Sequence, residues 1–160
     1  MGNEYVIDGV TYTKDHVLSR FPGDRNGDFT VPEGVKSIGN GAFARCAGLE
    51  TVTLPDSVER LEQGCFYNCT SLRLVRLGAG LRVIGDSAFS RCVSLSQVEL
   101  PEGLEEILPC AFEMCTSLRE IRLPASVRKI SILAFLGGTI VRCNPAQFRM
   151  LPRDAKMRTT

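Results

Sequence analysis

The chain has 160 residues, of which 44% are hydrophobic and 23% are charged, values typical of one soluble globular domain. Nineteen Lys and Arg against eighteen Asp and Glu give a formal charge of +1, which argues against the basic surface that a nucleic-acid partner requires. No apolar run approaches the roughly 20 residues of a membrane span, and the first residues lack the basic and apolar regions of a secretion signal. We therefore expect no nucleic-acid partner and no membrane insertion, and either the protein is cytoplasmic or its signal is missing from this sequence.

The first predicted element is a β-hairpin. Residues 5–7 (YVI) and 10–12 (VTY) favour strands, and Asp8-Gly9 between them is a strong signal for a two-residue turn. We assign residues 1–25 to this hairpin. It is expected to cap the array of repeats that follows, because the ends of such arrays expose apolar surface.

A 23-residue repeat follows in five copies, over residues 26–140. Its consensus is L-x-x-V-x-L-P-x-x-V-x-x-I-x-x-x-A-F-x-x-C. One phenylalanine marks each copy: Phe43, Phe66, Phe89, Phe112 and Phe135. A cysteine follows the first four of them at a constant spacing: Cys46, Cys69, Cys92 and Cys115. We expect both sets of side chains to form the structural core.

Each repeat is predicted to form one coil of a solenoid. The V-x-L segment alternates in polarity, which indicates a short strand with one buried face, and the proline after it ends the strand because it lacks an N–H donor. In A-F-x-x-C, the Phe and Cys side chains face the same side of a short helical or 3₁₀ turn. A single coil cannot bury its own apolar side chains, so the coils must stack. The predicted fold is a right-handed, curved, β-rich α/β solenoid of short parallel strands with one such turn per coil.

These columns resemble the BspA-like class of leucine-rich repeats, typified by bacterial cell-surface proteins and also found in protozoan ones. The resemblance covers residues 26–140. Residues 9–22 (GVTYTKDHVLSRFP) also resemble the leader that often precedes the first repeat in that family. The resemblance implies a leucine-rich-repeat fold, a binding or adhesion role, and a location at the cell surface or outside the cell.

The remainder of the chain is assigned to a C-terminal cap and tail (residues 141–160). Asn144-Pro145 interrupts the next strand, and Pro145 is expected to begin a helical turn. Phe148 and Leu151 are expected to fold back onto the last coil. From Arg153 onward the tail is expected to be frayed.

The seven cysteines could serve packing, redox chemistry or metal binding. Four of them share one repeat column beside the phenylalanines, and a free cysteine behaves as a small hydrophobe, so we interpret this column as core. No pair has the C-x-x-C spacing of a zinc site. His16 is the single histidine, and neither a G-x-S-x-G element nor a phosphate-binding loop is present. The sequence therefore predicts no metal, no cofactor and no enzymatic activity.

The outward side chains of the V-x-L strands form the predicted binding face, in two columns down one side of the solenoid. They include Thr51, Thr53, Arg76, Gln97, Glu99, Glu120 and Arg122. Arg76, Glu99 and Arg122 alternate in charge, which predicts either a ladder of ion pairs between coils or a mixed-charge binding face.

The predicted function is a non-enzymatic binding or adhesion module that presents this repeat surface to a protein or glycan partner. Two alternatives stay open. The chain could be a structural spacer of a larger surface protein, or an intracellular scaffold for protein–protein interactions. The unpaired thiols favour the second alternative, because they survive best in a reducing compartment.

Overall fold

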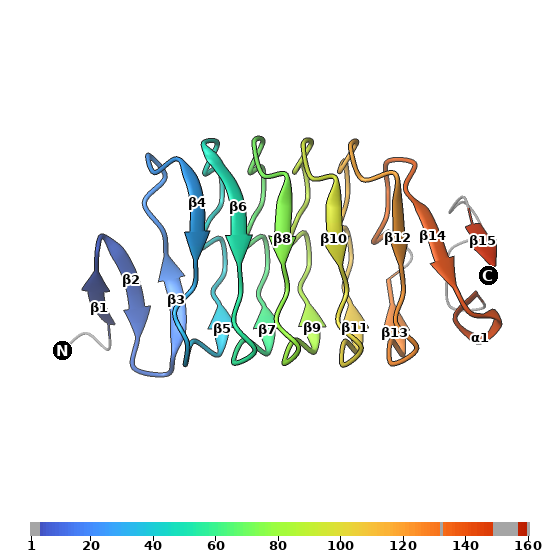
Figure 1. Ribbon diagram of the computed structural model, residues 1–160, viewed down its shortest axis with the longest axis horizontal. Coiled ribbons are helices and arrows are strands. Elements are labelled where there is room, and N and C mark those ends of the chain that lie inside the picture. Colours follow the sequence, from blue (N-terminus) through green and yellow to red (C-terminus); the bar gives the residue numbers. More distant parts are fainter. Residues whose placement is uncertain (1–3, 132, 149–156, 160) are drawn as a thin grey trace.

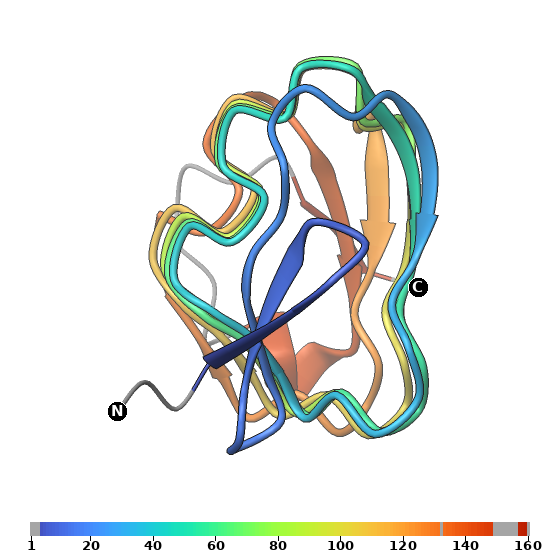
Figure 2. The same ribbon diagram turned by 90° about the vertical axis from the view of Figure 1, so that its left-hand side faces the viewer.

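The chain forms a β-solenoid in the computed structural model, which describes residues 4–131, 133–148 and 157–159. Figure 1 shows the coils side by side along the long axis of the molecule, from the N-terminal strands to the C-terminal ones. Figure 2 looks along that axis and shows that the middle coils superpose closely. The predicted stack of short parallel strands is confirmed.

One face of the solenoid carries the V-x-L strands. They are β4 (Gly27–Thr30), β6 (Leu49–Thr53), β8 (Leu74–Arg76), β10 (Gln97–Glu99), β12 (Glu120–Arg122) and β14 (Ile140–Cys143). The first four form a 4-stranded parallel sheet, whereas β12 and β14 belong to a 3-stranded sheet with β15 (Met157–Thr159). Across the described residues no ladder of hydrogen bonds joins β10 to β12, so this strand face is interrupted between them.

A second face carries shorter strands, one in each coil, and each follows the V-x-L strand of its coil. They are β5 (Ser37–Ile38), β7 (Arg60–Leu61), β9 (Val83–Ile84), β11 (Glu106–Ile107) and β13 (Lys129–Ile130). With β1, β2 and β3 they complete an 8-stranded sheet. Ile38 pairs with Leu61 and Leu61 pairs with Ile84, so the register advances by one repeat from each coil to the next. This sheet continues past the point where the first face is interrupted.

The A-F-x-x-C corner of each coil is an isolated turn. The Cys46 N–H donates to the Phe43 carbonyl oxygen over 3.1 Å, an i→i−3 bond of the 3₁₀ type. Gly41 and Arg45, on either side, have φ values of 60° and 63°, so the right-handed turn cannot continue into a helix. The one helix of the described residues is α1 (Pro145–Phe148). No helix in this part of the chain has the length and hydropathy to cross a membrane.

Phenylalanine rings form a continuous stack through the core. Four of them are fully buried: Phe43, Phe66, Phe89 and Phe112. Successive ring centroids in this group lie 4.8, 5.2 and 5.2 Å apart, with interplanar angles of 2° to 16°. Phe135 continues the stack at 5.4 Å from its neighbour. Phe21 extends it in the other direction, 4.7 Å from Phe43, so the stack begins before the first repeat.

The cysteine column lies beside these rings and is hydrogen-bonded across the coils. The thiols of Cys69, Cys92 and Cys115 each donate to the carbonyl oxygen of a phenylalanine 26 residues earlier. The sulfur-to-oxygen distances are 3.0, 3.0 and 3.1 Å. All four column cysteines are buried and fill space, and these three thiols also link each coil to the preceding one.

Three strands, not two, precede the first coil. β1 (Glu4–Ile7) and β2 (Val10–Thr13) form an antiparallel hairpin around Asp8-Gly9. β3 (Val17–Arg20), which the sequence did not predict, pairs antiparallel with β2 and parallel with β5. The side chains that cover the first coil come from β2, β3 and the residues after them, whereas every residue of β1 is exposed. We therefore propose that the cap within residues 1–25 consists of β2 and β3.

The last coil is shorter than the others. Glu120 pairs with Ile140, so the register advances by 20 residues instead of 23. The expected boundary after residue 140 consequently falls inside β14. The expected fraying from Arg153 onward is wrong for residues 157–159, because β15 pairs with β14. Leu151 and the side chain of Phe148 lie outside the described part of the chain.

A capping box closes this end. The Asn144 amide oxygen accepts from the Gln147 N–H over 2.9 Å, and the Gln147 side-chain oxygen accepts from the Asn144 N–H over 3.1 Å. Pro145 occupies the first helical position, as the sequence predicts. The buried Gln147 side chain also donates to the Pro124 carbonyl oxygen over 2.6 Å, which ties α1 to the last coil.

Candidate functional site

The strand face holds most of the predicted binding residues, in two columns. In the first, Thr51 of β6 lies beside Leu74 of β8, and Leu74 lies beside Gln97 of β10. In the second, Thr53, Arg76 and Glu99 are neighbours in the same way. Glu120 and Arg122 occupy the matching outward positions of β12. The predicted alternation of side chains along these strands places all seven residues on one face.

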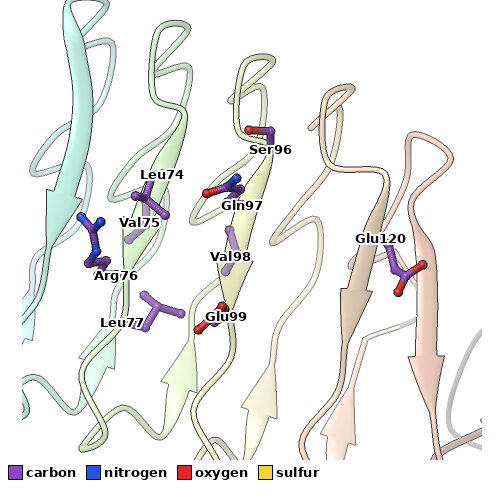
Figure 3. A pocket seen from close by; sticks show the side chains of 9 residues that line it. All are labelled: Leu74, Val75, Arg76, Leu77, Ser96, Gln97, Val98, Glu99 and Glu120. Atoms are coloured by element: carbon purple, nitrogen blue, oxygen red, sulfur yellow. The ribbon is translucent and has the colours of Figure 1, made fainter.

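A groove of about 670 Å³ opens in this face over β8, β10 and β12 (Figure 3). Four of the seven predicted residues line it: Arg76, Gln97, Glu99 and Glu120. Its apolar part comes from β8 and β10 and includes Leu74, Leu77 and Val98. Val98 is 9% exposed, whereas its column neighbours Val75 and Ile121 are 1% and 2% exposed. The groove thus lies mainly over the coils of β8 and β10, and Glu120 is its one lining residue from β12.

The charges at this groove do not pair with one another. Within the described part of the chain, Arg76 and Glu99 take part in no ion pair. Figure 3 shows Arg76 extending from β8 away from Glu99. Glu120 points toward β14 and pairs with Arg142. The predicted ion-pair ladder along Arg76, Glu99 and Arg122 is therefore wrong.

Other ion pairs between coils lie on the second face. Lys36 pairs with Glu59 at 2.9 Å, and Lys129 pairs with Glu106 at 3.1 Å. The four side chains are partly to largely exposed, from 37% for Glu106 to 65% for Lys129, so each pair contributes about 0–1 kcal/mol. The alternating charges of that face are partly satisfied within the protein, unlike those of Arg76 and Glu99.

Three of the predicted residues lie outside the groove. Thr51 and Thr53 are on β6, beside its β8 wall. Arg122 lines a separate hollow of about 160 Å³ with Arg142 and Gln147. The apolar lining was not part of the predicted set. Leu74 carried a usable signal, because it is the apolar member of a column otherwise formed by Thr51, Gln97 and Glu120.

The buried thiols lack the features of reactive cysteines. Burial raises the pKa of Cys46 and of Cys115 to about 12, because the thiolate would lose its hydration. Burial also raises the pKa of Cys65 well above its usual range. A thiol becomes a nucleophile or metal ligand through a lowered pKa, so the arrangement suits packing. Among the described residues, no three His, Cys, Asp or Glu side chains are grouped as metal ligands.

Comparison with known proteins places these features in a family. The profile of the BspA type leucine-rich repeat region matches residues 20–141, in six copies. The match thus counts one copy more than the five predicted repeats, and it begins before residue 26, where the first of these was placed. No curated protein sequence matches the chain.

Solved structures of bacterial leucine-rich-repeat proteins are similar in fold and sequence. A leucine-rich cell surface protein from Faecalibacterium prausnitzii is 33% identical, with a TM-score of 0.86 over 96% of this chain and 43% of its own. The T. pallidum leucine-rich-repeat protein is also 33% identical, with a TM-score of 0.75 over 79% of this chain and 63% of its own. A leucine-rich-repeat protein from Bacteroides ovatus is 25% identical, with a TM-score of 0.64 over 88% of this chain and 47% of its own. The chain therefore spans less than two thirds of the length of each of these proteins, and it belongs to the BspA-type leucine-rich-repeat family.

Proposed function

We propose that the chain is a non-enzymatic binding module of a bacterial surface protein, and that the groove over β8, β10 and β12 receives an extended segment of a protein partner. The observation that carries the proposal is the groove itself, in which the partly exposed Leu74 and Leu77 lie among polar side chains and in which Arg76 and Glu99 form no ion pair with the described residues. The name of the Faecalibacterium prausnitzii protein supports the surface location.

The chemistry of the groove favours a polypeptide. Leu74, Leu77 and Val98 offer aliphatic contact, and charges of both signs stand at its rim. Such a surface suits an apolar side chain flanked by one acidic and one basic group, because rim charges steer association and fix register. No aromatic ring lines the groove in the described part of the chain, so it lacks the flat ring surface on which a sugar would stack.

A charge swap tests the proposal. The double variant Arg76→Glu/Glu99→Arg reverses both rim charges and keeps the net charge. We expect saturable binding of the purified, reduced protein to at least one member of an array of immobilised extracellular-matrix proteins and glycans. The swap should weaken that binding at least tenfold, because the altered charges meet the partner with the wrong sign.

The matched control is Glu105→Arg/Arg128→Glu, which makes the same exchange one repeat apart on the second face. It should bind like the unaltered protein. If both variants lose binding equally, the site lies elsewhere, or the weaker binding reflects the overall distribution of charge and not the groove. Silence across the array would instead support the spacer or the intracellular scaffold.

A further inference from the structure

We infer that the outer edge of β1 is a second binding site, which adds an extended basic and apolar polypeptide strand to the 8-stranded sheet. The site lies at the N-terminal end of the solenoid, away from the groove over β8, β10 and β12 (Figure 1). The inference is independent of the proposed function of that groove.

The backbone of β1 offers hydrogen-bonding groups along its open side. β1 is the terminal strand of its sheet, and within the described residues it pairs with β2 alone. Asp8 and Gly9 have φ values of 49° and 79°, as in the two-residue turn of a tight hairpin. In such a hairpin the flanking pair, Ile7 and Val10, exchanges hydrogen bonds, and the pattern then alternates along the strands. The N–H and C=O groups of Val6 therefore point to the open edge.

The side chains of β1 are not used by the core. Tyr5, Val6 and Ile7 are 46%, 63% and 54% exposed. Natural proteins usually protect an exposed edge strand with lysine, proline or a bulge. The one irregularity here lies between β2 and β3, at Thr11 and Tyr12, and leaves the register of β1 regular. A regular, apolar and exposed edge is the feature that strand addition requires.

A hollow beside this edge can accept a side chain from the added strand. It measures about 280 Å³ and lies between the Tyr5 and Ile7 face of β1, His16, and the first-coil turn at residues 32–35. Its back wall includes Tyr12, whose ring stacks on that of Tyr5 with 5.7 Å between centroids. In strand addition, backbone bonds supply affinity, and such pockets select side chains.

Charge selects the occupant. Glu4 and Asp8 flank the apolar residues of β1, and Glu33 lines the hollow. The Glu4 carboxylate accepts a hydrogen bond from the Ser19 hydroxyl over 3.2 Å, and the described residues give it no ion-pair partner. Arg25 is a cation near this edge, and its guanidinium donates a hydrogen bond to the Asp8 carbonyl oxygen over 3.2 Å. The acidic side chains favour a strand that brings lysine or arginine.

A second copy of the chain fits this edge poorly. Antiparallel pairing of two β1 strands about Val6 would place Glu4 of one copy opposite Asp8 of the other, twice. Like charges directly opposite each other destabilise a sheet. The favoured occupant is therefore a segment of another polypeptide with basic residues at both ends of a short apolar run.

The test uses the full chain and a blocked synthetic peptide of sequence GKVTVKG, followed by amide chemical shifts in NMR spectra. We expect saturable shifts centred on the Val6 amide and the residues of the hairpin. The peptide GEVTVEG, with the opposite charges, should bind at least tenfold more weakly. Added salt should reduce the difference between the two peptides, because the charges are exposed.

Two variants separate edge pairing from general affinity. Val6→Pro removes the N–H that faces the open edge and spares those that face β2, so it should weaken binding at least tenfold, whereas Val6→Thr should bind like the unaltered chain. Ile7→Lys leaves the backbone intact and places a cation at the hollow, and it should also weaken binding at least tenfold. Undiminished binding to both Val6→Pro and Ile7→Lys, or shifts on β8 and β10 in place of the hairpin, would overturn the inference. The inference would also be overturned if the chain self-associated through β1 in a concentration-dependent way and did not bind the peptide, because the edge would then pair with a second copy of the chain.

Discussion

Replacement of Phe89 by alanine tests whether the ring stack carries the stability of the solenoid. Phe89 is fully buried, and its ring lies between those of Phe66 and Phe112 with both centroids 5.2 Å away. Truncating a buried phenylalanine costs about 3–5 kcal/mol, because apolar contacts are lost and a cavity remains. Part of this cost is the loss of stacking, which is worth about 0.5–1.5 kcal/mol per pair beyond burial. Since two pairs are lost, we expect Phe89→Ala to cost about 4–5 kcal/mol, at the upper end of the range.

Urea unfolding followed by circular dichroism measures this cost, with Phe135→Ala as the comparison. Phe135 is 8% exposed and has one stacked ring neighbour among the described residues, at 5.4 Å, so its loss should cost about 2–3 kcal/mol. A smaller m value for Phe89→Ala would indicate that the coils on either side unfold separately, as expected when each coil contacts only its neighbours. A cost below about 1 kcal/mol, or one no larger than that of Phe135→Ala, would refute the reasoning.

Three further outcomes follow from the geometry. The free energy of unfolding should fall as pH rises from 9.0 toward about 12. Burial raises the pKa of Cys115 to about 12 in the folded protein, so in this interval the thiol deprotonates in the unfolded chain but stays neutral in the fold, and deprotonation favours unfolding. Urea unfolding across this interval should show a shallower decline for Cys115→Ala. Ser87 has a φ of 54°, so Ser87→Gly should relieve backbone strain and stabilise the protein by about 0.5–1 kcal/mol, whereas an unchanged or lower thermal midpoint would count against this strain. Gln147→Leu should destabilise by about 1–3 kcal/mol, because the Asn144 N–H and the Pro124 carbonyl oxygen both lose their partner, and a matched Ala146→Leu control should not.

Inward-facing positions could be predicted from the sequence because stacking imposes the same environment on every coil. Phe66 contacts its counterparts one repeat before and after, so its column keeps phenylalanine, and the period is visible in a single chain. The capping box was only half predicted. Pro145 marks the first turn, but the partnership of Asn144 with Gln147 needs the strand before it to end at Cys143.

Other features have no periodic signal. β3 buries Leu18 completely among four residues, and one buried side chain gives no alternation to detect. The interruption between β10 and β12 is also hidden, because Leu95 and Leu118 keep the repeat spacing across it. The shortened advance of 20 residues lies one coil later, between β12 and β14, so it gives no signal at this position either.

The contrast between the two faces suggests where a partner is recognised. On the second face, Lys36 and Lys129 pair with glutamates of adjacent coils, so charge there contributes to the stack. On the strand face, Glu120 pairs with Arg142 of the next coil. Arg76 and Glu99 are neighbours in register but form no ion pair with the described residues, and they lie beside a mostly polar groove that Leu74 and Leu77 also line. Exposed charges without partners contribute almost nothing to the stability of the fold, and neither does apolar surface that stays open to solvent. Covering such a surface with another molecule is favourable, whereas leaving it open stabilises nothing. This difference between the two faces, more than the family resemblance, makes β8 and β10 the first place to look for binding.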